Sequence, residues 1–445
     1  MNVLKKIYDT MPVWVQNLMC SVKGYTILKR RYNKSFIEEL RRFESREYNP
    51  KEELRRFLLA IKEVPAYNGI LTDEDIAILE ENPENVYKII KRYPIIDKAY
   101  VKEHLYDFNN LDYVGDTFVS KTSGTTGVSL SFVYPVEFEN KQWAVWWRYR
   151  RALGISLDDW QGWFGGKMII SADCSKGPYW RINYPGKQVM FSSYHINQHT
   201  ISFYHQEIIK RKLKWLHGYP STIAELSSQI VKAGLPEIDS VTIITTGAEN
   251  LSDYQIFQMS KAFPHAIIRT HYGLSEGVAN MSQDKEGEWR VDNDFCYVEF
   301  EPTDDGGLCR IIGTGFWNQA FPLVRYDTGD LATVERDVEG NVIRIISVDG
   351  RQSDFLTLPD GRRVGPLNQV LKVCEHIVSI QFVQQKGGEV IVKVVCDTDY
   401  TDKDERQLRK SLEERLKGDF NYRIDYVSSI EKTKSGKSKL VISEL

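Results

Sequence analysis

Apolar residues recur at helical spacing through the first quarter of the chain. Runs such as Phe36–Phe43, Glu52–Lys62 and Asp73–Glu81 place apolar residues three and four positions apart, which predicts amphipathic helices. Tyr93-Pro-Ile-Ile-Asp97 interrupts this pattern, because proline disfavours a helical conformation in the residue before it. We therefore expect a helical N-terminal segment over residues 1–110.

The first thirty residues carry an apolar stretch, Met11–Cys20, between clusters of basic residues. The basic residues are Lys5, Lys6, Lys23, Lys29, Arg30 and Arg31. One interpretation is an interfacial segment that touches anionic lipid, which gives a peripheral association with the membrane. The other is a pair of amphipathic helices that pack on the body of the protein and expose their basic faces. We favour the second, because the Tyr and Trp positions also suit a stripe that faces the core.

From residue 117 onward, strand patterns begin to alternate with helical ones. Phe118–Ser120 and Leu130–Val133 predict two strands of a hairpin, joined by a glycine turn at Gly124–Gly127. A tryptophan-rich run over Glu137–Arg151 predicts a helix, which Gly154 closes.

The next segment repeats strands and helices in succession. Thr222-Ile-Ala-Glu225 has the pattern of a capping box, so we expect a helix to begin there and to end at Gly234. Val241–Thr246 predicts a buried strand, Ser252 opens the next helix, and Ile267–Thr270 is again a strand. This succession predicts parallel α/β layering.

After Gly277 the pattern becomes that of an all-β region. The expected strands are Tyr297–Phe300, Leu308–Ile312, Leu331–Glu335 and Val342–Ser347. Gly350-Arg-Gln-Ser-Asp354 is typical of a domain boundary. Beyond it we expect a helix over Pro366–Cys374, strands over Ile380–Val383 and Val390–Val395, and a helix over Lys403–Leu416. The predicted fold class is α/β, with a large layered N-terminal domain (1–350) that includes a β-rich subdomain, and a small mobile α+β C-terminal domain (351–445).

The composition of the chain excludes several classes of protein but does not by itself indicate a function. A chain of 445 residues with 42% apolar and 12% aromatic residues is long enough for a large core and a smaller one. The net charge of −3 gives no overall positive field, so we expect no nucleic-acid partner. No apolar run approaches a membrane span and the first residues lack a secretory segment, so we expect a cytoplasmic protein. The six cysteines are scattered without metal-like spacing, which predicts reduced, buried thiols.

A glycine loop at Thr122–Gly127 is the first of three motifs with candidate chemistry. Gly124 and Gly127 let backbone N–H groups turn around a polyphosphate, and the hydroxyls between them can donate to it or reach Mg²⁺. Taken alone, such a loop is more often an ordinary turn, and it lacks the ending of a Walker loop. Gly436-Lys-Ser438 spells that ending, but too few residues follow it to form the helix that would hold phosphates.

The other two motifs supply an aromatic ring and two carboxylates. In His271-Tyr-Gly-Leu-Ser-Glu276, Tyr272 can stack on a purine, and Glu276 can bind a hard cation beside a triphosphate. In Arg325-Tyr-Asp-Thr-Gly-Asp330, the last carboxylate can accept hydrogen bonds from ribose hydroxyls. Lys437 can place positive charge between a carboxylate and an α-phosphate. Each also has an ordinary reading: a packed tyrosine, a surface acid, an acid in a turn, and a solvated lysine.

In this order, the motifs resemble those of the adenylate-forming superfamily, which includes acyl-CoA synthetases, peptide-synthetase adenylation domains and firefly luciferase. The matching segments are Thr122–Gly127, Gly247-Ala-Glu249, Tyr272–Glu276, Arg325–Asp330, Gly350-Arg351 and Lys432–Lys437. Val64-Pro-Ala-Tyr67 and Tyr93–Lys98 are similar to segments of the phenylacetate–CoA ligase branch. Within that branch the chain resembles the CapK-like members, which are associated with capsular polysaccharide synthesis.

The resemblance implies a role for each matched residue. The residues implied to hold the phosphates of ATP are Ser123, Gly124, Thr125, Thr126 and Gly127. Those implied to surround the adenine are Gly247, Ala248, Glu249, His271, Tyr272, Gly273 and Ser275. Asp330 and Arg351 would hold the ribose, while Glu276 and Thr126 would bind Mg²⁺. The implied catalytic set is Lys437, Glu276 and Thr126, with the lysine carried by the mobile small domain.

The implied reaction joins a small carboxylic acid to ATP, which gives an acyl-adenylate and pyrophosphate. The acyl group then passes to a thiol such as coenzyme A, or to the amine of an amino acid or amino sugar. Candidate walls of the acid pocket are Trp163, Gly165, Gly166, Lys167, Tyr194, His217 and Tyr219.

Three departures make coenzyme A less secure than ATP and Mg²⁺. Ser129-Leu130 replaces the usual Pro-Lys end of the loop, Ser353 stands at the usual hinge acid, and Leu358–Gly365 is longer than in many relatives. Two alternatives stay open: an aryl acid–CoA ligase of the phenylacetate type, and a non-catalytic nucleotide-binding partner of polysaccharide assembly machinery. Lys437 together with Glu276 and Asp330 favours the enzyme, because a retired site has no need of this lysine.

Overall fold

The structure is a computed structural model of the chain. It describes residues 3–121, 130–303, 307–351, 355–357, 363–364, 367, 370, 374, 376–416, 420–431 and 438–444. By its internal contacts the chain divides into two units. Unit 1 comprises Met1–Thr26, Ile155–Thr270 and Asp349–Leu445, and unit 2 comprises Ile27–Gly154 and His271–Val348. The sequence predicts that residues 351–445 form a small domain that moves relative to the rest of the chain. This boundary near residue 350 stays a prediction.

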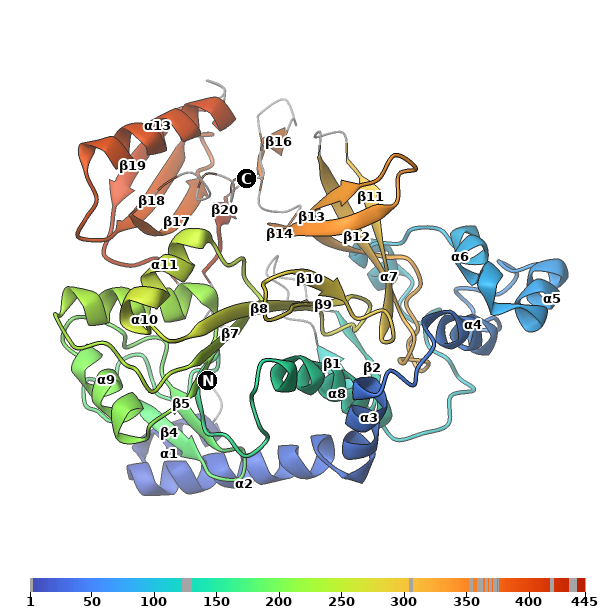
Figure 1. The fold of residues 1–445 in the computed structure, drawn as a ribbon, viewed down its shortest axis with the longest axis horizontal. Helices are drawn as coiled ribbons and strands as arrows, with labels where there is room; N and C mark the ends of the chain where they lie inside the picture. Colours follow the sequence, from blue (N-terminus) through green and yellow to red (C-terminus); the bar gives the residue numbers. More distant parts are fainter. Residues whose placement is uncertain are drawn as a thin grey trace. The chain divides into compact units, whose positions relative to one another are not determined.

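A mostly parallel sheet with helices beside it forms the larger part of unit 1 (Figure 1). In the described part of the chain this sheet has eight strands, and the five at one end are, in spatial order, β7 (Ile243–Gly247), β6 (Trp215–Gly218), β3 (Gln161–Phe164), β5 (Gln188–Phe191) and β4 (Trp180–Asn183). The helices between them in sequence are α9 (Ile201–Lys210), α10 (Pro220–Lys232) and α11 (Asp253–Ala262). Among these five strands, β7, β6, β3 and β5 pair in parallel, and β4 pairs antiparallel with β5. All five residues of β7 are buried, as is typical of a parallel strand covered on both faces, so the predicted α/β layering is confirmed.

The sequence predicts the starts of two helices, α10 and α11, and the structure confirms one of them. Ser252 caps α11 and forms a capping box with Gln255, as its sequence indicates. The expected box at Thr222 is wrong, because α10 already begins at Pro220 and Thr222 lies buried in its first turn. Proline suits the first turn of a helix, where no partner exists for an N–H. The predicted end is right, since Gly234 follows α10 with φ +61°.

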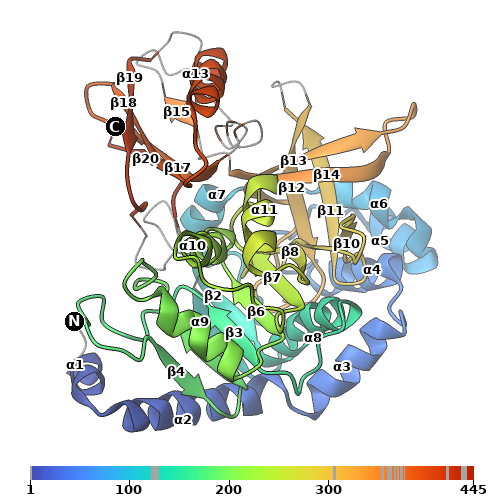
Figure 2. The ribbon, with the colours of Figure 1, turned by 60° about the vertical axis from the view of Figure 1, so that its left-hand side comes forward.

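The C-terminal part of unit 1 has its own small sheet and core (Figure 2). Its strands lie in the order β19 (Tyr422–Tyr426), β18 (Val390–Cys396), β17 (Ile377–Gln384) and β20 (Val441–Ser443). α13 (Asp402–Leu416) buries Leu408 and Leu412 against Phe382 and Val392. A short pair, β15 (Leu356–Thr357) and β16 (Arg363–Val364), precedes them. The two predicted strands and the later helix are confirmed, whereas most of the expected helix Pro366–Cys374 lies outside the described residues.

Unit 2 contains the predicted N-terminal helices, the hairpin and the β-rich region. Its helices include α3 (Lys34–Glu44), α4 (Pro50–Ala60), α5 (Asp73–Glu81), α6 (Val86–Ile89), α7 (Lys98–Glu103) and α8 (Val136–Ala152). Two 3₁₀ turns, η1 (Pro83–Asn85) and η2 (Ile90–Arg92), lie among them. β1 (Thr117–Lys121) pairs with β2 (Ser131–Pro135) in the expected antiparallel hairpin. The four-stranded sheet β11 (Cys296–Pro302), β12 (Leu308–Gly315), β13 (Tyr326–Arg336) and β14 (Val342–Arg351) confirms the all-β region.

β8 (Ile267–Gly273) carries the chain from unit 1 into unit 2. Its last residues pair with β9 (Asn280–Gln283), which pairs in turn with β10 (Trp289–Val291). Tyr272 therefore lies opposite Met281 within a small antiparallel ladder, so its backbone is held by neighbouring strands. All six cysteines are free thiols as predicted, but Cys20, Cys174 and Cys396 are only partly buried.

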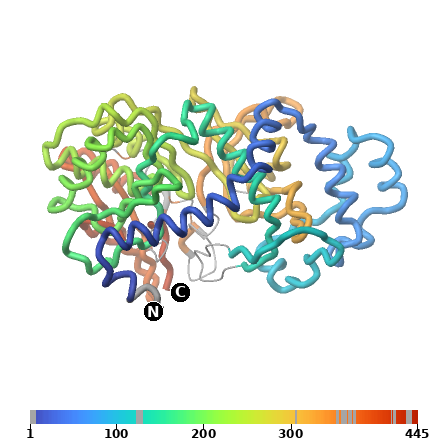
Figure 3. The backbone as a smooth tube through the Cα atoms, turned by 90° about the horizontal axis from the view of Figure 1, so that it is seen from below, coloured from blue at the N-terminus to red at the C-terminus, as the bar shows by residue number. Residues whose placement is uncertain are grey.

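The first two helices correct one expectation about the N-terminus. α1 (Val3–Thr10) and α2 (Val13–Arg31) form the expected pair and lie in front in the view from below (Figure 3). The buried residues of α2 are Gln16, Ser21 and Gly24, whereas Trp14 is 70% exposed. The expectation that the Trp and Tyr positions face the core is therefore wrong for Trp14 and for Tyr25, which is 49% exposed, whereas the hydroxyl of Tyr8 donates a hydrogen bond to the carbonyl of Ile169 at 3.0 Å. In the described part of the chain, no helix combines the length and apolarity needed to cross a membrane.

Candidate functional site

In unit 1, several predicted site residues lie where the parallel strands end. Gly165 and Gly166 follow β3, Tyr219 follows β6, and Tyr194 lies in the loop after β5. Glu249 follows β7. Because parallel strands share one carboxyl edge, loops from different strands converge there, and this is where open α/β sheets bind ligands. The fold therefore supplies a physical reason for these residues to act together.

Two of the predicted acid-pocket residues are neighbours on adjacent strands. Trp163 of β3 lies directly opposite His217 of β6 in their parallel ladder. The imidazole of His217 is oriented by Thr245 of β7, whose Oγ1 lies 2.9 Å from Nδ1 and whose carbonyl oxygen lies 3.1 Å from it. Lys167, in contrast, is exposed.

Tyr219 links this group to the loop after β7. Burial and, to a smaller extent, the nearby Glu249 carboxylate raise the pKa of Tyr219 to about 12, although a hydrogen bond with the backbone of Gly166 opposes the rise. The phenol thus stays protonated at neutral pH and can donate a hydrogen bond.

Glu249 is held by two parts of unit 1 that are far apart in sequence. Its Oε2 accepts hydrogen bonds from the hydroxyl of Ser221 at 2.6 Å and from the backbone N–H of Ser221 at 3.3 Å. Its Oε1 accepts from the backbone N–H of Ser438 at 3.1 Å. Ser221 stands in the first turn of α10, where a negative charge is favourable. Ala248, with φ +65°, sets the sharp turn that brings this carboxylate back to the helix.

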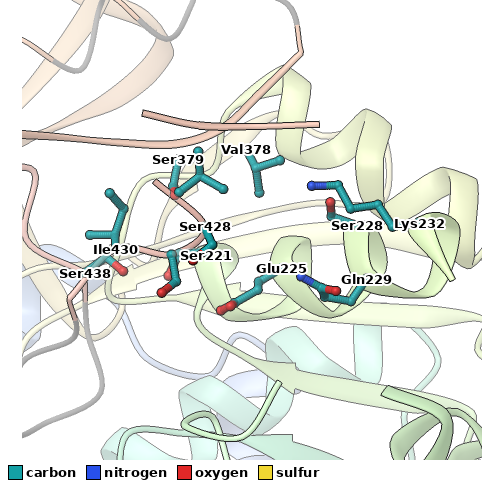
Figure 4. A pocket seen from close by; sticks show the side chains of 12 residues that line it. Ser221, Glu225, Ser228, Gln229, Lys232, Val378, Ser379, Ser428, Ile430 and Ser438 are labelled. Carbon is teal, nitrogen blue, oxygen red and sulfur yellow. The ribbon is translucent and has the colours of Figure 1, made fainter. Parts of the chain in front are cut away.

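A small polar pocket lies beside these contacts, between α10 and the C-terminal strands of unit 1 (Figure 4). Its lining residues are Ser221, Glu225, Ser228, Gln229, Lys232, Val378, Ser379, Val395, Ser428, Ser429, Ile430 and Ser438. Two of them, Ser221 and Ser438, are the partners of Glu249. Serine hydroxyls, the amide of Gln229, the carboxylate of Glu225 and the ammonium group of Lys232 favour a polar occupant. This pocket could not be predicted from the sequence, because α10 and the C-terminal segments that line it are about 150 residues or more apart.

In unit 2, the structure brings together the tyrosine of one motif and the last carboxylate of another. The hydroxyl of Tyr272 donates a hydrogen bond to Oδ2 of Asp330 at 2.7 Å. The backbone of Asp330 donates to Oγ1 of Thr328 at 3.1 Å, and Gly329 between them has φ +73°. Asp330 is therefore set by its own turn and by Tyr272, and its side chain is buried.

Glu276 is a second buried carboxylate in unit 2. The turn after it depends on Gly277, which has φ +68° and whose added Cβ would lie 2.1 Å from the ring of Phe138. The pKa of Tyr326 is strongly raised, first by burial and then by the charges of Glu276 and Asp330. Both carboxylates therefore act on one buried phenol, which indicates that they lie in one region.

The remaining residues predicted to surround the adenine lie in different environments. His271 lies between the rings of Trp146 and Tyr149, each 5.8 Å away between centroids. Gly273 and Ser275 are exposed. Gly247 is buried at the end of β7, in unit 1.

Arg325 has a structural role that the sequence reading missed. It donates hydrogen bonds to both oxygens of Glu299, at 3.0 and 3.1 Å, and to the carbonyl of Tyr93 at 2.9 Å. A buried bidentate pair of this kind fixes geometry more than it stabilises the fold. The conspicuous Tyr93-Pro segment is thereby tied to the strand that carries Asp330.

Part of the predicted site lies outside the described residues. This part comprises Ser123, Gly124, Thr125, Thr126, Gly127 and Lys437. Arg351 ends β14, and its side chain is likewise not described. The roles implied for these residues stay predictions.

One group in the described part of the chain brings metal-binding side chains together, and it is not the predicted one. Ligand atoms of His376, Asp397 and Asp399 lie within 4.8 Å of one another. Tyr254 and Gln258 already donate to Oδ2 of Asp397, so the group is a hydrogen-bonded contact between α11 and the end of β18. For Mg²⁺ the residue that fits is Glu276, a buried carboxylate of the hard oxygen type.

Comparison with known proteins agrees with the resemblance read from the motifs. Residues 356–444 match the family model of the CapK C-terminal domain. The chain is also 27% identical to Protein CapK of Staphylococcus aureus over 465 aligned positions, which cover 100% of both chains.

Two solved structures are similar in fold over most of the chain. Both are of 2-hydroxyisobutyryl-CoA ligase in the postadenylation state, in complex with R3-HIB-AMP in one and 2-HIB-AMP in the other. Each has a TM-score of 0.61 and 14% identity, and the match covers 89% of each chain. The chain therefore resembles the fold of adenylate-forming ligases, with a large N-terminal and a smaller C-terminal domain, and the predicted fold class is confirmed.

Proposed function

We propose that the protein is an ATP-dependent ligase that activates a carboxylic acid as an acyl-adenylate and transfers the acyl group to a thiol or an amine. The substrate belongs to polysaccharide biosynthesis or modification. The likeness to Protein CapK supports the second statement, since a capsule function is what the CapK-like resemblance implies. The fold shared with a CoA ligase that binds acyl-AMP supports the first.

The observation that carries the proposal is the hydrogen bond between Tyr272 and Asp330. The two residues belong to different motifs and are 58 positions apart, yet the hydroxyl oxygen of Tyr272 lies 2.7 Å from Oδ2 of Asp330. A nucleoside needs this pair of groups: a flat apolar surface for the base and an acceptor for the ribose hydroxyls. If a packed tyrosine had merely met an acid in a turn, there would be no reason for both to stand in motifs that resemble those of the adenylate-forming superfamily, in the same order along the chain.

The chain's own residues divide the work of the proposed reaction. Asp330 accepts from the ribose, and Tyr272 stacks on the adenine while its hydroxyl holds Asp330 in place. Glu276, with Thr126, would hold Mg²⁺, which neutralises phosphate charge when bound. Lys437 stabilises the charge that develops as the carboxylate attacks the α-phosphate and pyrophosphate leaves.

The acid is proposed to lie at the carboxyl edge of the parallel sheet in unit 1. Trp163 and His217 offer a partly apolar wall, and the protonated hydroxyl of Tyr219 offers one donor. Gly165, Gly166 and Tyr194 complete this wall, and Lys167 stands at its exposed rim. A small acid with a polar substituent suits such a surface.

The test is pyrophosphate exchange into ATP, measured across a panel of carboxylic acids with and without coenzyme A. We expect exchange only with particular acids, and AMP release only when the right acceptor is added. Hydroxylamine can trap the acyl-adenylate whatever the natural acceptor is, so the first step is tested separately. If ATP binds but no acid in a broad panel supports exchange or trapping, the protein is a nucleotide-binding partner and the proposal is wrong.

A further inference from the structure

The face that α2 turns toward unit 1 is polar, which is unusual for a helix lying on a protein. Oδ1 of Asn17 accepts from the backbone N–H of Ile182 at 2.9 Å. The hydroxyl of Ser21 donates to the carbonyl of Ile182 at 3.3 Å and accepts from the N–H of Tyr184 at 3.2 Å. Ile182 belongs to β4, the edge strand of the sheet. The helix thus satisfies backbone groups that an edge strand leaves open, and this task needs polar side chains.

The orientation of α2 is fixed by close contact as well as by these hydrogen bonds. A Cβ added to Gly24 would lie 1.9 Å from Oδ1 of Asn183, so the helix and the strand approach as closely as glycine permits. Gln16, one turn before Ser21, is buried and donates to the carbonyls of Tyr8 and Met11. The helix therefore cannot turn its other side inward without losing these contacts.

The opposite face of α2 carries large apolar side chains and is exposed. Trp14 is 70% exposed, Leu18 is 55% exposed and Val22 is 59% exposed. Their spacing of four residues puts them on one side of the helix, and Tyr25, 49% exposed, continues the same line. Single exposed apolar residues are ordinary, but a contiguous stripe of four on one helix face marks an interaction site.

The charge of α2 differs from that of the whole chain. The sequence of the helix, VWVQNLMCSVKGYTILKRR, holds four basic residues and no acidic one, while the chain has a net charge of −3. Two of the four, Arg30 and Arg31, form ion pairs with Glu139 at 2.6 and 2.7 Å, so we count only the other two toward a contact with an outside partner. Lys23 and Lys29 are exposed. Lys29 follows Tyr25 by one turn, so a positive charge stands at the end of the apolar stripe.

We propose that α2 is a membrane-surface anchor, which inserts its apolar stripe into the headgroup boundary of a bilayer that contains anionic lipid. Tryptophan and tyrosine are enriched at that boundary, and lysine stems can lie along it while the ammonium groups meet lipid phosphates. A second copy of the chain is a poorer occupant, because a two-fold interface along α2 would bring Lys23 and Lys29 near the same lysines of the other copy, with no acid on the helix to offset them. The proposal does not depend on the reaction that the protein catalyses.

The experiment is flotation of the full chain with vesicles of phosphatidylcholine alone, or of phosphatidylcholine mixed with phosphatidylglycerol. We expect binding to the mixed vesicles that falls as salt is raised, since exposed charges are screened. The double variant Leu18→Ser/Val22→Ser should bind at least about tenfold more weakly, because two inserted apolar side chains are lost. The matched control is Phe203→Ser/Ile209→Ser on α9, whose side chains are 46% and 43% exposed, and it should bind as the wild type does.

The charge and the alternative occupant are tested separately. Lys23→Gln/Lys29→Gln should weaken binding to the mixed vesicles and leave the weak binding to neutral vesicles unchanged. All substituted side chains are exposed, so unfolding profiles should match the wild type. Absence of binding to the mixed vesicles overturns the proposal. So does a wild-type dimer in sedimentation that Leu18→Ser/Val22→Ser converts to a monomer, because a second copy would then be the occupant.

Discussion

The backbone N–H of Ser438 donates a hydrogen bond to Oε1 of Glu249, at 3.1 Å, although the two residues are 189 positions apart. Glu249 belongs to a loop that the resemblance assigns to the adenine pocket. Ser438 directly follows Lys437, the proposed catalytic lysine. One carboxylate thereby fastens the beginning of α10 and the segment that carries the lysine.

Glu249→Gln should loosen this segment. Gln retains an acceptor but loses the charge, and hydrogen bonds to charged groups are the stronger ones, so we expect a loss of about 1 kcal/mol in unfolding free energy. Cleavage by a protease after residue 430 should also become faster than in the wild type. Glu237→Gln, an exposed acid in the loop after α10, is the control and should change neither quantity. Equal cleavage rates in all three proteins would mean that Glu249 does not hold Ser438 in solution.

Asp330→Ala should weaken ATP binding by roughly ten- to a hundredfold, because charge-assisted hydrogen bonds to a ligand contribute about 1.5–3 kcal/mol. Tyr272→Phe keeps the ring and removes only the hydroxyl that orients Asp330, so its effect should be smaller. Isothermal titration of ATP measures both. Glu335→Ala, an exposed acid on the same strand, is the control. If Asp330→Ala binds ATP as tightly as the wild type does, the ribose assignment is wrong.

Lys437→Ala should slow acyl-adenylate formation by about a hundredfold or more while ATP affinity barely changes, because the ammonium acts on charge that appears only in the transition state. Glu276→Gln should likewise slow adenylation more than it weakens ATP binding. Transfer from a pre-made acyl-adenylate should survive in Lys437→Ala. Lys439→Ala, two residues on, is the matched control. A Lys437→Ala protein that adenylates at the wild-type rate would show this lysine to be a solvated residue.

Asp292 should make the stability of unit 2 depend on pH. Burial raises its pKa to about 6, even though the guanidinium of Arg148, with Nη2 2.6 Å from Oδ1, opposes this rise. A carboxyl whose folded pKa lies above its ordinary value of 3.8 binds its proton more tightly in the folded state. Its contribution is therefore favourable at low pH and is lost as pH rises through about 6.

The measurement is the urea midpoint of the wild type and of Asp292→Asn from pH 4 to pH 7. Relative to the variant, the wild type should lose on the order of 2 kcal/mol of stability across this range. Parallel pH profiles for the two proteins would contradict the raised pKa.

The fold could be predicted wherever a local pattern reports burial. Val241–Thr246 predicted a buried strand, and the strand Ile243–Gly247 is buried throughout. Ser252 with Gln255 predicted a helix start that needs no distant partner. Thr222 misled because the start of α10 is set by Pro220 and by Glu249, which comes from another loop. A capping pattern read from sequence cannot anticipate an acceptor that tertiary structure supplies.

In the candidate site, too, the sequence could not predict contacts with partners that lie far away along the chain. Tyr272 and Asp330 could be paired in advance, because each stands in a motif whose residue types suit one ligand. The partners of Arg325 and Glu249 could not, since nothing in the sequence near Glu299 or Ser438 marks them as their acceptor and donor. The direction in which Trp14 points was also hidden, because it depends on the open edge of a strand far along the chain.

The contact between α2 and β4 also limits how the chain can be shortened. Asn17 and Ser21 occupy the outer N–H and carbonyl of Ile182, so no further strand can add to the sheet at that side. A version that begins after residue 26 would leave this strand bare, and a bare edge recruits strands from other molecules. Such a version should form β-sheet aggregates during refolding even if the proposed ATP site is intact. The first helices thus act as a built-in block on self-assembly, and shortened proteins meant for crystallisation should retain them.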